Sequence, residues 1–430
     1  MPKTFMPSFK DIAALKKHQL KGLQWTAAHA YQGSDFYRQK MDEAGVQPDG
    51  IQTLEDIRKL PFTTAEDLRE GYPFPLLSVP ESRVVRIHAS SGTTGKRKIL
   101  AYTQKDIDDW ICFFARCYEM AGLTREDRVQ IAVGYGVWTA GVGFQLGCEK
   151  FGAMALPVGP GNVDMQCQFL VDLQSTVMCC TASMGLLMAE EIKRRGLRDK
   201  IALKKMIFGS ERSSDAMRRR IKDLLGLADM FDIPGMTELY GPGTGLDCDR
   251  HEGIHYWADY YIIEILDPDN LEPIPAGETG EMVITTLCKE AAPLIRYRTR
   301  DLTRLIDHAC SCGNILPMHD RILGRSDDMI IFRAVNIYPG QIDQVLSTIP
   351  DASCEYQVHL DRKQDGKDYM TIRLECAEEF DQSRKPELAK KVADEIKNKV
   401  MVSAAVDVVE YGTLPRSERK SKRFFDNRPE

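Results

Sequence analysis

Hydrophobic positions along the chain recur at two spacings, and each spacing predicts a different element. The first 80 residues carry apolar side chains at helical intervals, and Thr53-Leu-Glu-Asp56 resembles a capping box, the exchange of hydrogen bonds that begins a helix. Thr103 and Asp106 repeat that spacing ahead of an apolar stripe made of Ile107, Trp110, Ile111, Phe114 and Tyr118. We therefore expect amphipathic helices in the first 80 residues and again after Thr103, the latter ending near Gly122.

Short β-like runs alternate with helices through the next part of the chain. They are residues 84–88, 98–102, 129–133, 175–181 and 205–208, and a helix capped at Ser213 or Ser214 follows the last of them. Strands that alternate with helices pack as a largely parallel sheet covered by helices. This region is therefore predicted to be α/β.

The pattern changes twice more towards the C-terminus. Strand and turn signals dominate at 260–286, which predicts a β-rich subdomain. Beyond Asp327, strands are expected at 329–332, 356–360, 370–376 and 406–409, with helices at 339–349 and 386–401. We predict an α/β fold with a large N-terminal domain, residues 1–326, in which helices cover the sheets, and a small mobile α+β domain, residues 327–430.

Composition narrows the class of protein. Of 430 residues, 43% are hydrophobic and 28% charged, which excludes disorder, and the net charge of -6 gives no general reason to bind nucleic acid. Twelve cysteines are too few for a disulfide scaffold, and the N-terminus has no apolar signal segment, so we expect a cytoplasmic protein. The uncharged run 129–148 contains five glycines, so a buried strand, turn and helix fit it better than a membrane span.

Residues 88–97, H-A-S-S-G-T-T-G-K-R, form the most informative segment. Glycines, hydroxyls and a lysine this close together can surround phosphate oxygens with N–H and O–H donors. The segment is not a P-loop, because only two residues separate the glycines and Arg97 follows Lys96. The alternative is a flexible loop rich in glycine, serine and threonine.

Several ordered segments together resemble the adenylate-forming superfamily of acyl- and aryl-CoA synthetases. They are the phosphate-binding loop at 90–96, the nucleotide segment at 232–239, the ribose segment at 296–303, the hinge at 324–330 and the catalytic-lysine loop at 414–420. The segments at 285–296 and 335–339 are most similar to the phenylacetate–CoA ligase family.

The resemblance implies a role for each matching residue. The catalytic residues would be Lys420, Thr94 and Glu238, with Glu238 also holding Mg²⁺. The ATP and AMP site would contain Ser90, Ser91, Gly92, Thr93, Thr94, Gly95, Lys96, Gly209, Ser210, Glu211, Asp232, Ile233, Pro234, Gly235, Met236, Thr237, Asp301 and Arg325. The acyl pocket would contain Tyr135, Trp138, Phe144 and Met236, and the hinge and CoA channel Asp327, Arg333, Ala334, Val335 and Asn336.

Each of these roles has a plainer alternative. Glu238 could be an exposed loop carboxylate, and Asp301 could belong to an ion-pair cluster with the surrounding arginines. Lys420 could lie in a solvated basic tail, and the aromatic residues of the acyl pocket could be ordinary core.

A second group of residues points to a metal. Cys310-Ser-Cys312-Gly is a tight turn that can present two thiolates to one tetrahedral ion, and Cys248 and His255 could complete the site. His251 is the other candidate for the histidine ligand. We predict a structural Zn²⁺ here; the alternative is a set of buried, reduced cysteines, as we expect for the other nine.

The sequence therefore predicts an AMP-forming aryl- or arylacetate–CoA ligase that uses ATP, Mg²⁺ and CoA, without a membrane partner and compatible with a homodimer. The chain departs from the family at Arg97, Pro234, Ala334 and Arg419. Ala334 motivates an alternative in which an amine takes the acyl group or AMP itself is transferred. Pro234, Arg97 and Arg419 motivate a second alternative, a weakly active nucleotide-binding regulatory protein.

Overall fold

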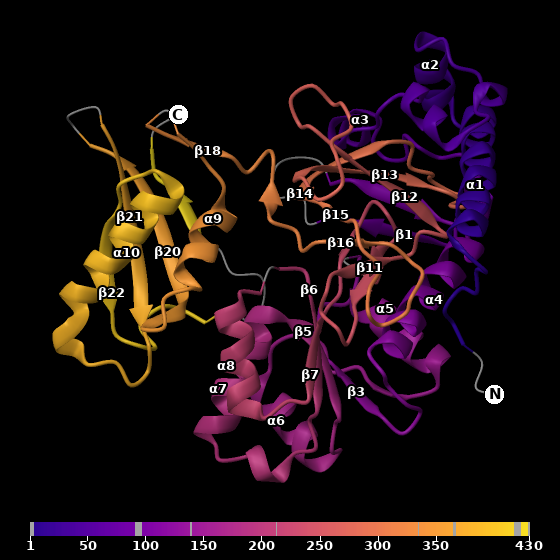
Figure 1. The fold of residues 1–430 in the computed structure, drawn as a ribbon. Coiled ribbons are helices and arrows are strands. Elements are labelled where there is room, and N and C mark those ends of the chain that lie inside the picture. The colour runs from indigo at the N-terminus through magenta and orange to yellow at the C-terminus, as the bar shows by residue number, and fades with distance from the viewer. Residues whose placement is uncertain are drawn as a thin grey trace.

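The computed structural model describes residues 4–90, 97–137, 140–211, 213–333, 335–363, 367–416 and 423–428. The N-terminal part is helical, as predicted: α1 (Ile12–Gly33), α2 (Asp35–Glu43) and α3 (Ala65–Glu70), with a 3-10 helix at Leu54–Lys59 and single 3-10 turns at Pro48–Gly50, Glu81–Arg83 and later at Arg198–Lys200. Thr53 and Asp56 form the predicted capping box, at the start of a 3-10 helix. Figure 1 shows α1 running along one side of the large domain, beside β12 and β13.

A five-stranded parallel sheet organises the middle of the large domain. Its strands lie in the order β4 (Met154–Leu156), β3 (Arg128–Ile131), β5 (Val177–Thr181), β6 (Lys205–Gly209) and β7 (Asp229–Asp232). The connecting helices are α4 (Gln104–Met120), α5 (Ala140–Phe151), α6 (Val163–Asp172), α7 (Ala182–Arg194) and α8 (Asp215–Leu225). The predicted α/β region is confirmed, and 129–148 is a strand, a turn and a helix.

Both faces of this sheet are buried, so neighbouring residues of one strand belong to different cores. Val177 and Cys179 of β5 pack into the core that also contains α4 and α5. Met178 and Cys180 pack into the core formed with α6, α7 and α8. This arrangement explains why the strands read as continuous apolar runs rather than as alternating ones. Among the described residues, no helix is long and apolar enough to cross a membrane.

Antiparallel strands make up the rest of the large domain. One sheet has the order β12 (Tyr261–Leu266), β13 (Gly280–Thr286), β14 (Tyr297–Thr303) and β17 (Gly324–Arg325), and another the order β10 (Gly245–Asp247), β11 (Ile254–Tyr256), β16 (Met318–His319) and β15 (Leu305–Ile306). Two hairpins pair β1 (Arg86–Ala89) with β2 (Ile99–Tyr102) and β8 (Gly235–Met236) with β9 (Gly241–Pro242).

The small domain begins with the hairpin β18 (Ile330–Phe332) and β19 (Val335–Ile337). Its sheet has the order β22 (Ala405–Val409), β21 (Asp368–Cys376), β20 (Ala352–Arg362) and β23 (Phe424–Asp426), with α9 (Pro339–Leu346), a 3-10 turn at Gln382–Arg384 and α10 (Lys385–Val400). Its core residues, from Phe332 to Val408, form a cluster of their own. In Figure 1 it lies to one side of the large domain, next to α7 and α8.

Candidate functional site

The carboxyl ends of three neighbouring parallel strands meet at one edge of the sheet. β5 ends at Thr181, β6 at Gly209 and β7 at Asp232. Ligands of open α/β sheets bind at this edge, because the loops that follow the strands gather there. Gly209, Ser210 and Glu211 therefore lie at the expected position, and Ser210 has a positive φ of 74°, a strained conformation typical of functional turns.

The proposed phosphate loop joins β1 to β2. At its base the Ser90 N–H donates to the Lys98 carbonyl at 3.0 Å, and the Lys98 N–H donates to Ser90 Oγ at 3.1 Å. Strands flank the loop on both sides, as the sequence predicted. The other loop residues, Ser91, Gly92, Thr93, Thr94, Gly95 and Lys96, lie outside the described residues, and so do Trp138, Ala334 and Lys420.

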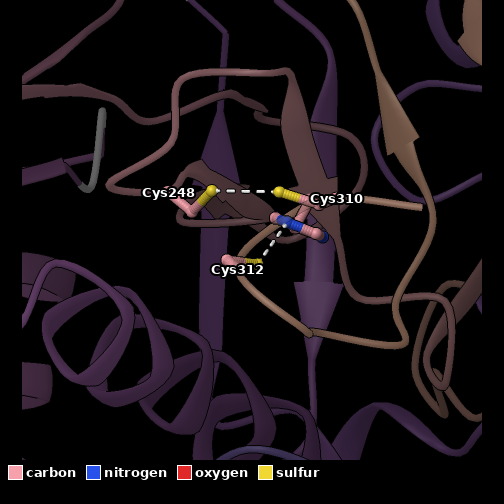
Figure 2. Close-up of side chains that lie close together, drawn as sticks. Cys248, Cys310 and Cys312 are labelled. Atoms are coloured by element: carbon pink, nitrogen blue, oxygen red, sulfur yellow. Dashed lines mark hydrogen bonds between the residues drawn. The ribbon is translucent and has the colours of Figure 1, made fainter. Parts of the chain in front are cut away.

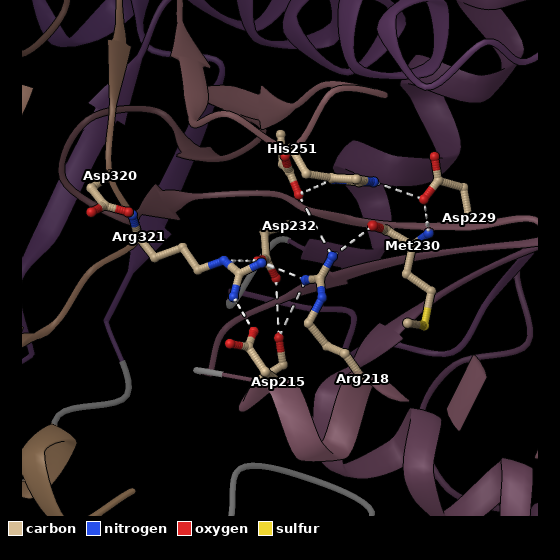
Figure 3. A network of polar contacts seen from close by, with 10 residues as sticks. Asp215, Arg218, Asp229, Met230, Asp232, His251, Asp320 and Arg321 are labelled. Carbon is tan, nitrogen blue, oxygen red and sulfur yellow. Dashed lines mark hydrogen bonds and ion pairs between the residues drawn. The ribbon is translucent and has the colours of Figure 1, made fainter. Parts of the chain in front are cut away.

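The nucleotide segment starts from a rigid polar network at Asp232 (Figure 3). Arg218 of α8 donates to Asp232 Oδ2 at 2.7 Å, and Arg321 Nε lies 3.2 Å from the same oxygen. Arg218 also donates to the Met230 carbonyl at 2.7 Å. Two guanidinium groups therefore fix the carboxylate from which Ile233, Pro234 and the following residues continue.

The segment then turns back through the β8–β9 hairpin. Gly235 pairs with Pro242, and a Cβ on Gly235 would lie only 2.3 Å from Pro242 Cα. Any other residue would push the two strands apart, so this glycine is required by close backbone approach. Thr237 is held by its carbonyl, which accepts the hydroxyl of Tyr102 at 2.9 Å.

Glu238 is buried and its carboxylate is paired. Lys98 forms an ion pair with it, and the Tyr297 hydroxyl donates to Oε1 at 3.0 Å. Burial raises the pKa of Glu238, but Lys98 and the hydrogen bonds outweigh it, so the pKa lies below its ordinary value. Lys289, itself buried, donates to the Glu238 carbonyl at 2.8 Å. Glu238 is therefore a fixed carboxylate rather than an exposed loop residue.

Asp301 and Arg325 face each other across paired strands. Asp301 of β14 is opposite Arg325 of β17, and Arg325 Nη1 lies 3.5 Å from Asp301 Oδ1. Arg325 also donates to Asp327 at 2.8 Å. Burial raises the pKa of Asp301 to about 6, against the attraction of Arg325. The proposed ribose ligand and the proposed hinge are thus in direct contact.

The aromatic residues of the proposed acyl pocket differ in exposure. Phe144 is buried, and its ring lies 4.8 Å from that of Phe114 in the core. Tyr135 is 36% exposed, and its ring covers Gly141 so closely that a Cβ there would lie 2.5 Å away. Met236 is partly buried against the same core.

The proposed CoA-channel strand is β19, in the hairpin that follows the hinge. Val335 pairs with Phe332 at the hairpin turn. Arg333 has a positive φ of 50° and donates through Nε to the Asp368 carbonyl at 2.8 Å. Asn336 pairs with Ile331. The hairpin is therefore attached to the small domain rather than to the large one.

The predicted metal residues come together (Figure 2). The ligand atoms of Cys248, His255, Cys310 and Cys312 all lie within 4.8 Å of one another. Cys248 Sγ is 3.5 Å from Cys310 Sγ, and Cys312 Sγ is 3.4 Å from His255 Nε2. The other His255 nitrogen, Nδ1, is 2.8 Å from the Leu316 carbonyl, which leaves Nε2 towards the sulfurs.

His251 lies outside this cluster. Its ring nitrogens are each 2.8 Å from a carboxylate, Nδ1 from Asp247 and Nε2 from Asp229 (Figure 3). The two carboxylates raise the pKa of His251 to about 9. The structure therefore brings His255, and not His251, to the cysteines.

Several residues of the site were not anticipated from the sequence. Lys98 and Tyr297 contact the Glu238 carboxylate, and Lys289 and Tyr102 hold the backbone at Thr237 and Glu238. Burial lowers the pKa of Lys289 to about 7. One signal was available for Lys289, because a lysine inside the apolar segment 285–295 needs a buried partner.

Comparisons with known proteins identify the family. The chain matches the AMP-binding enzyme family over residues 30–288 and the AMP-binding enzyme C-terminal domain over residues 334–428. It is 39% identical to a phenylacetate-coenzyme A ligase of Pseudomonas putida over 97% of this chain and 95% of the relative. It is 39% identical to one of Escherichia coli (strain K12) over 98% of this chain and 96% of the relative. The chain belongs to the phenylacetate–CoA ligase family.

The fold of this family member is also similar to those of solved structures. A 2-hydroxyisobutyryl-CoA ligase in the postadenylation state, in complex with 2-HIB-AMP, has a TM-score of 0.89 and 26% identity, and the match covers 97% of this chain and 90% of that one. The same enzyme in the thioesterification state has a TM-score of 0.70. The predicted adenylate-forming fold with a large and a small domain is therefore confirmed.

Proposed function

We propose that this protein is an AMP-forming arylacetate–CoA ligase. A carboxylate oxygen of the acid attacks the α-phosphorus of ATP, the bond to the β-phosphate breaks, and pyrophosphate leaves. The CoA thiolate then attacks the acyl carbon, and the bond to AMP breaks. The observation that carries the proposal concerns β14: its Tyr297 holds the Glu238 carboxylate and its Asp301 pairs with Arg325, in a chain whose relatives are phenylacetate–CoA ligases.

Glu238 would hold Mg²⁺ beside the phosphates. Glu238 fits this role because its lowered pKa favours the carboxylate anion, and in the described contacts Lys98 and Tyr297 both approach Oε1 rather than Oε2. When bound there with the nucleotide, Mg²⁺ would neutralise charge on the phosphate oxygens. Tyr297 and Lys289 keep the carboxylate and its backbone in place.

The nucleotide would be held by the loops at the strand edge. Asp301 would accept hydrogen bonds from the ribose hydroxyls, and Arg325 beside it would link ribose binding to the hinge. Gly209 and Ser210 would lie against the adenine, and Ser90 to Lys96 would surround the phosphates. The acid would bind near Tyr135 and Met236, with Trp138 and Phe144 completing the pocket.

A screen of ATP–pyrophosphate exchange over arylacetates, benzoates and short fatty acids tests the activity. Phenylacetate should support the fastest exchange, and CoA should then give the thioester. If exchange is fast but only an amine or hydroxylamine traps the acyl group, the alternative acceptor replaces CoA. If no acid supports exchange, the regulatory alternative replaces both.

Lys420 is proposed to act in adenylation only, by neutralising the charge that develops on the α-phosphate. Lys420→Ala should lower exchange by about 10²–10³-fold, the usual effect of removing one preorganised donor, yet still convert supplied acyl-adenylate to thioester. Ala334→Gly should have the opposite pattern and alter only the thiol step. Equal effects on both half-reactions would contradict either assignment.

We also propose that Cys248, His255, Cys310 and Cys312 bind one structural Zn²⁺. Zinc–sulfur bonds of about 2.3 Å place tetrahedral ligand atoms roughly 3.5–3.8 Å apart, close to the spacings at this cluster. The purified protein should contain close to one equivalent of zinc, and Cys310→Ser should lower metal content and melting temperature. His251→Gln is the matched control and should keep its zinc. Metal-free protein of full stability would contradict the proposal.

A further inference from the structure

One carboxylate of the large domain makes two hydrogen bonds to the small domain. Glu190 of α7 accepts a hydrogen bond from the Tyr411 hydroxyl and another from Arg416 Nε at 3.2 Å. The side chains of Glu190 and Arg416 are only 19% and 16% exposed, so this ion pair is shielded from solvent. Tyr411 and Arg416 belong to the segment that leads directly to Lys420.

The small domain prepares this segment for the contact. Glu375 of β21 is fully buried, and it accepts hydrogen bonds from the Leu414 N–H at 2.5 Å and from Arg416 Nη1 at 3.0 Å. Arg416 is therefore held on one side by its own domain and on the other by Glu190. Because the Arg416 guanidinium is bonded to carboxylates of both domains, it restrains the small domain relative to the large one.

A second ion pair supports the first nearby. Glu378 of the small domain accepts from Lys193 of α7 at 2.9 Å and from Arg220 of α8 at 2.5 Å. A cleft of about 560 Å³ separates the domains around these contacts. The interface thus consists of polar pairs around an open cleft, with an apolar contact where Cys354 packs against the core under α7 and α8. Such an interface suits domains that separate and dock again.

We propose that Glu190 is a positioning residue that holds the small domain in its adenylating arrangement, and that this contact is absent when the thiol step takes place. The inference rests on the proposed function. Two observations support it: the contact fixes the segment that precedes Lys420, and the present domain arrangement is closer to the postadenylation than to the thioesterification state of the related ligase.

The test measures the two half-reactions separately in Glu190→Gln, which removes the charge and keeps the shape. Acid-dependent ATP–pyrophosphate exchange should fall about five- to tenfold, a usual coupling between distant parts of a protein, whereas thioester formation from supplied acyl-adenylate should be unchanged or faster. Glu191→Gln is the matched control, because Glu191 pairs only with Arg194 and Arg195 of its own domain in the described interactions. It should leave both rates unchanged.

Hydrogen–deuterium exchange gives a readout that does not depend on activity. Residues 411–416 should lose protection in Glu190→Gln, and Glu378→Gln should weaken protection at the neighbouring part of α8. Unchanged protection at 411–416, or equal loss of both half-reactions, overturns the proposal. If the wild-type protein supports no exchange with any acid, the proposed function fails, and the protection measurement still decides whether Glu190 holds the domains together.

Discussion

Glu238 and Asp301 are carboxylates that each lie beside a cation, yet their pKa values move in opposite directions. Glu238 is in contact with Lys98 and with the Tyr297 hydroxyl, and these outweigh burial. Among the described residues, Arg325 is the one cation paired with Asp301, at 3.5 Å, and it is shared with Asp327. Burial therefore dominates at Asp301 and raises its pKa. The pKa of Glu238 is thus lowered, whereas that of Asp301 is raised to about 6.

This difference predicts how nucleotide binding depends on pH. Because the pKa of Asp301 is raised to about 6, the group is protonated below that pH and accepts hydrogen bonds poorly. The KM for ATP should fall as the pH rises from about 5 to about 7, where the carboxylate form predominates. Steady-state kinetics of Asp301→Asn should show a higher KM and no such change with pH.

Asp269→Asn, a change in an exposed turn, is the control and should behave as the wild type. A KM for ATP that is independent of pH in the wild-type protein would contradict the assignment of Asp301 to the ribose.

The candidate site could be predicted from the sequence where a short motif carried it. Cys310 and Cys312 share one turn, and residues 232–238 form one segment, so their local spacing in the sequence was sufficient to group them into candidate sites. Lys98 and Tyr297 could not be assigned to Glu238 in this way, because their contacts join the residue before β2, strand β14 and the loop after β8. The choice between His251 and His255 also required the fold, since only the pairing of β11 turns His255 towards the cysteines.

At the scale of elements, the first turn of α4 is hydrogen-bonded to residues 290–291, which are remote in the sequence. The predicted capping box is present: Asp106 accepts the Thr103 N–H at 3.0 Å. The same buried carboxylate also accepts the N–H groups of Glu290 and Ala291, at 2.7 and 2.9 Å. The sequence predicted the cap, but not this second role, because the partners are remote in the chain.

Asp106→Ala should therefore destabilise the protein more than the loss of a cap does. It leaves buried N–H groups without partners, and the expected cost is about 3 kcal/mol, measured by chemical denaturation. Asp108→Asn, an exposed change on the same helix, should cost less than about 0.5 kcal/mol. A cost for Asp106→Ala no larger than that of the control would contradict this role.

The loop after β10 gives a second dependence on pH. The neighbouring carboxylates raise the pKa of His251 from 6.5 to about 9, so protonation of this ring stabilises the folded state. That contribution is complete below pH 6.5 and is lost as the pH rises through about 9. The difference in melting temperature between the wild type and His251→Gln should accordingly shrink over this range. A constant or growing difference would show that the Asp229–His251–Asp247 contacts do not depend on charge.

At the scale of the whole molecule, the two domains have separate apolar cores joined by polar contacts. The small domain's core runs from Phe332 to Val408, and the described contacts with α7 and α8 include the ion pairs of Glu190 and Glu378. The change of pattern in the sequence predicted this division, because the closing segment has its own strands and helices. The relative placement of the domains depends on pairs such as Glu190 and Arg416, for which no local pattern exists.

The boundary at Asp327 can be tested directly. A fragment of residues 327–430 should fold alone, because its apolar core is complete without the large domain. It should show a near-ultraviolet circular dichroism signal and one cooperative unfolding transition. A fragment that lacks tertiary signal would place the boundary elsewhere or show that the large domain is required for folding.

The two-sided burial of the central sheet has a consequence for insertions and deletions. In a sheet with one solvent-exposed face, a register shift of one residue moves apolar side chains into solvent, which is unfavourable. Here both faces of the sheet are buried, so a register shift of β5 or β6 would still leave their apolar side chains buried. The register must instead be determined by how side chains of different size fit together. For example, the Phe208 ring packs against Gly185, and a Cβ at Gly185 would lie only 2.7 Å from it. Single-residue indels in these strands should therefore yield mispacked, aggregation-prone chains rather than locally frayed ones.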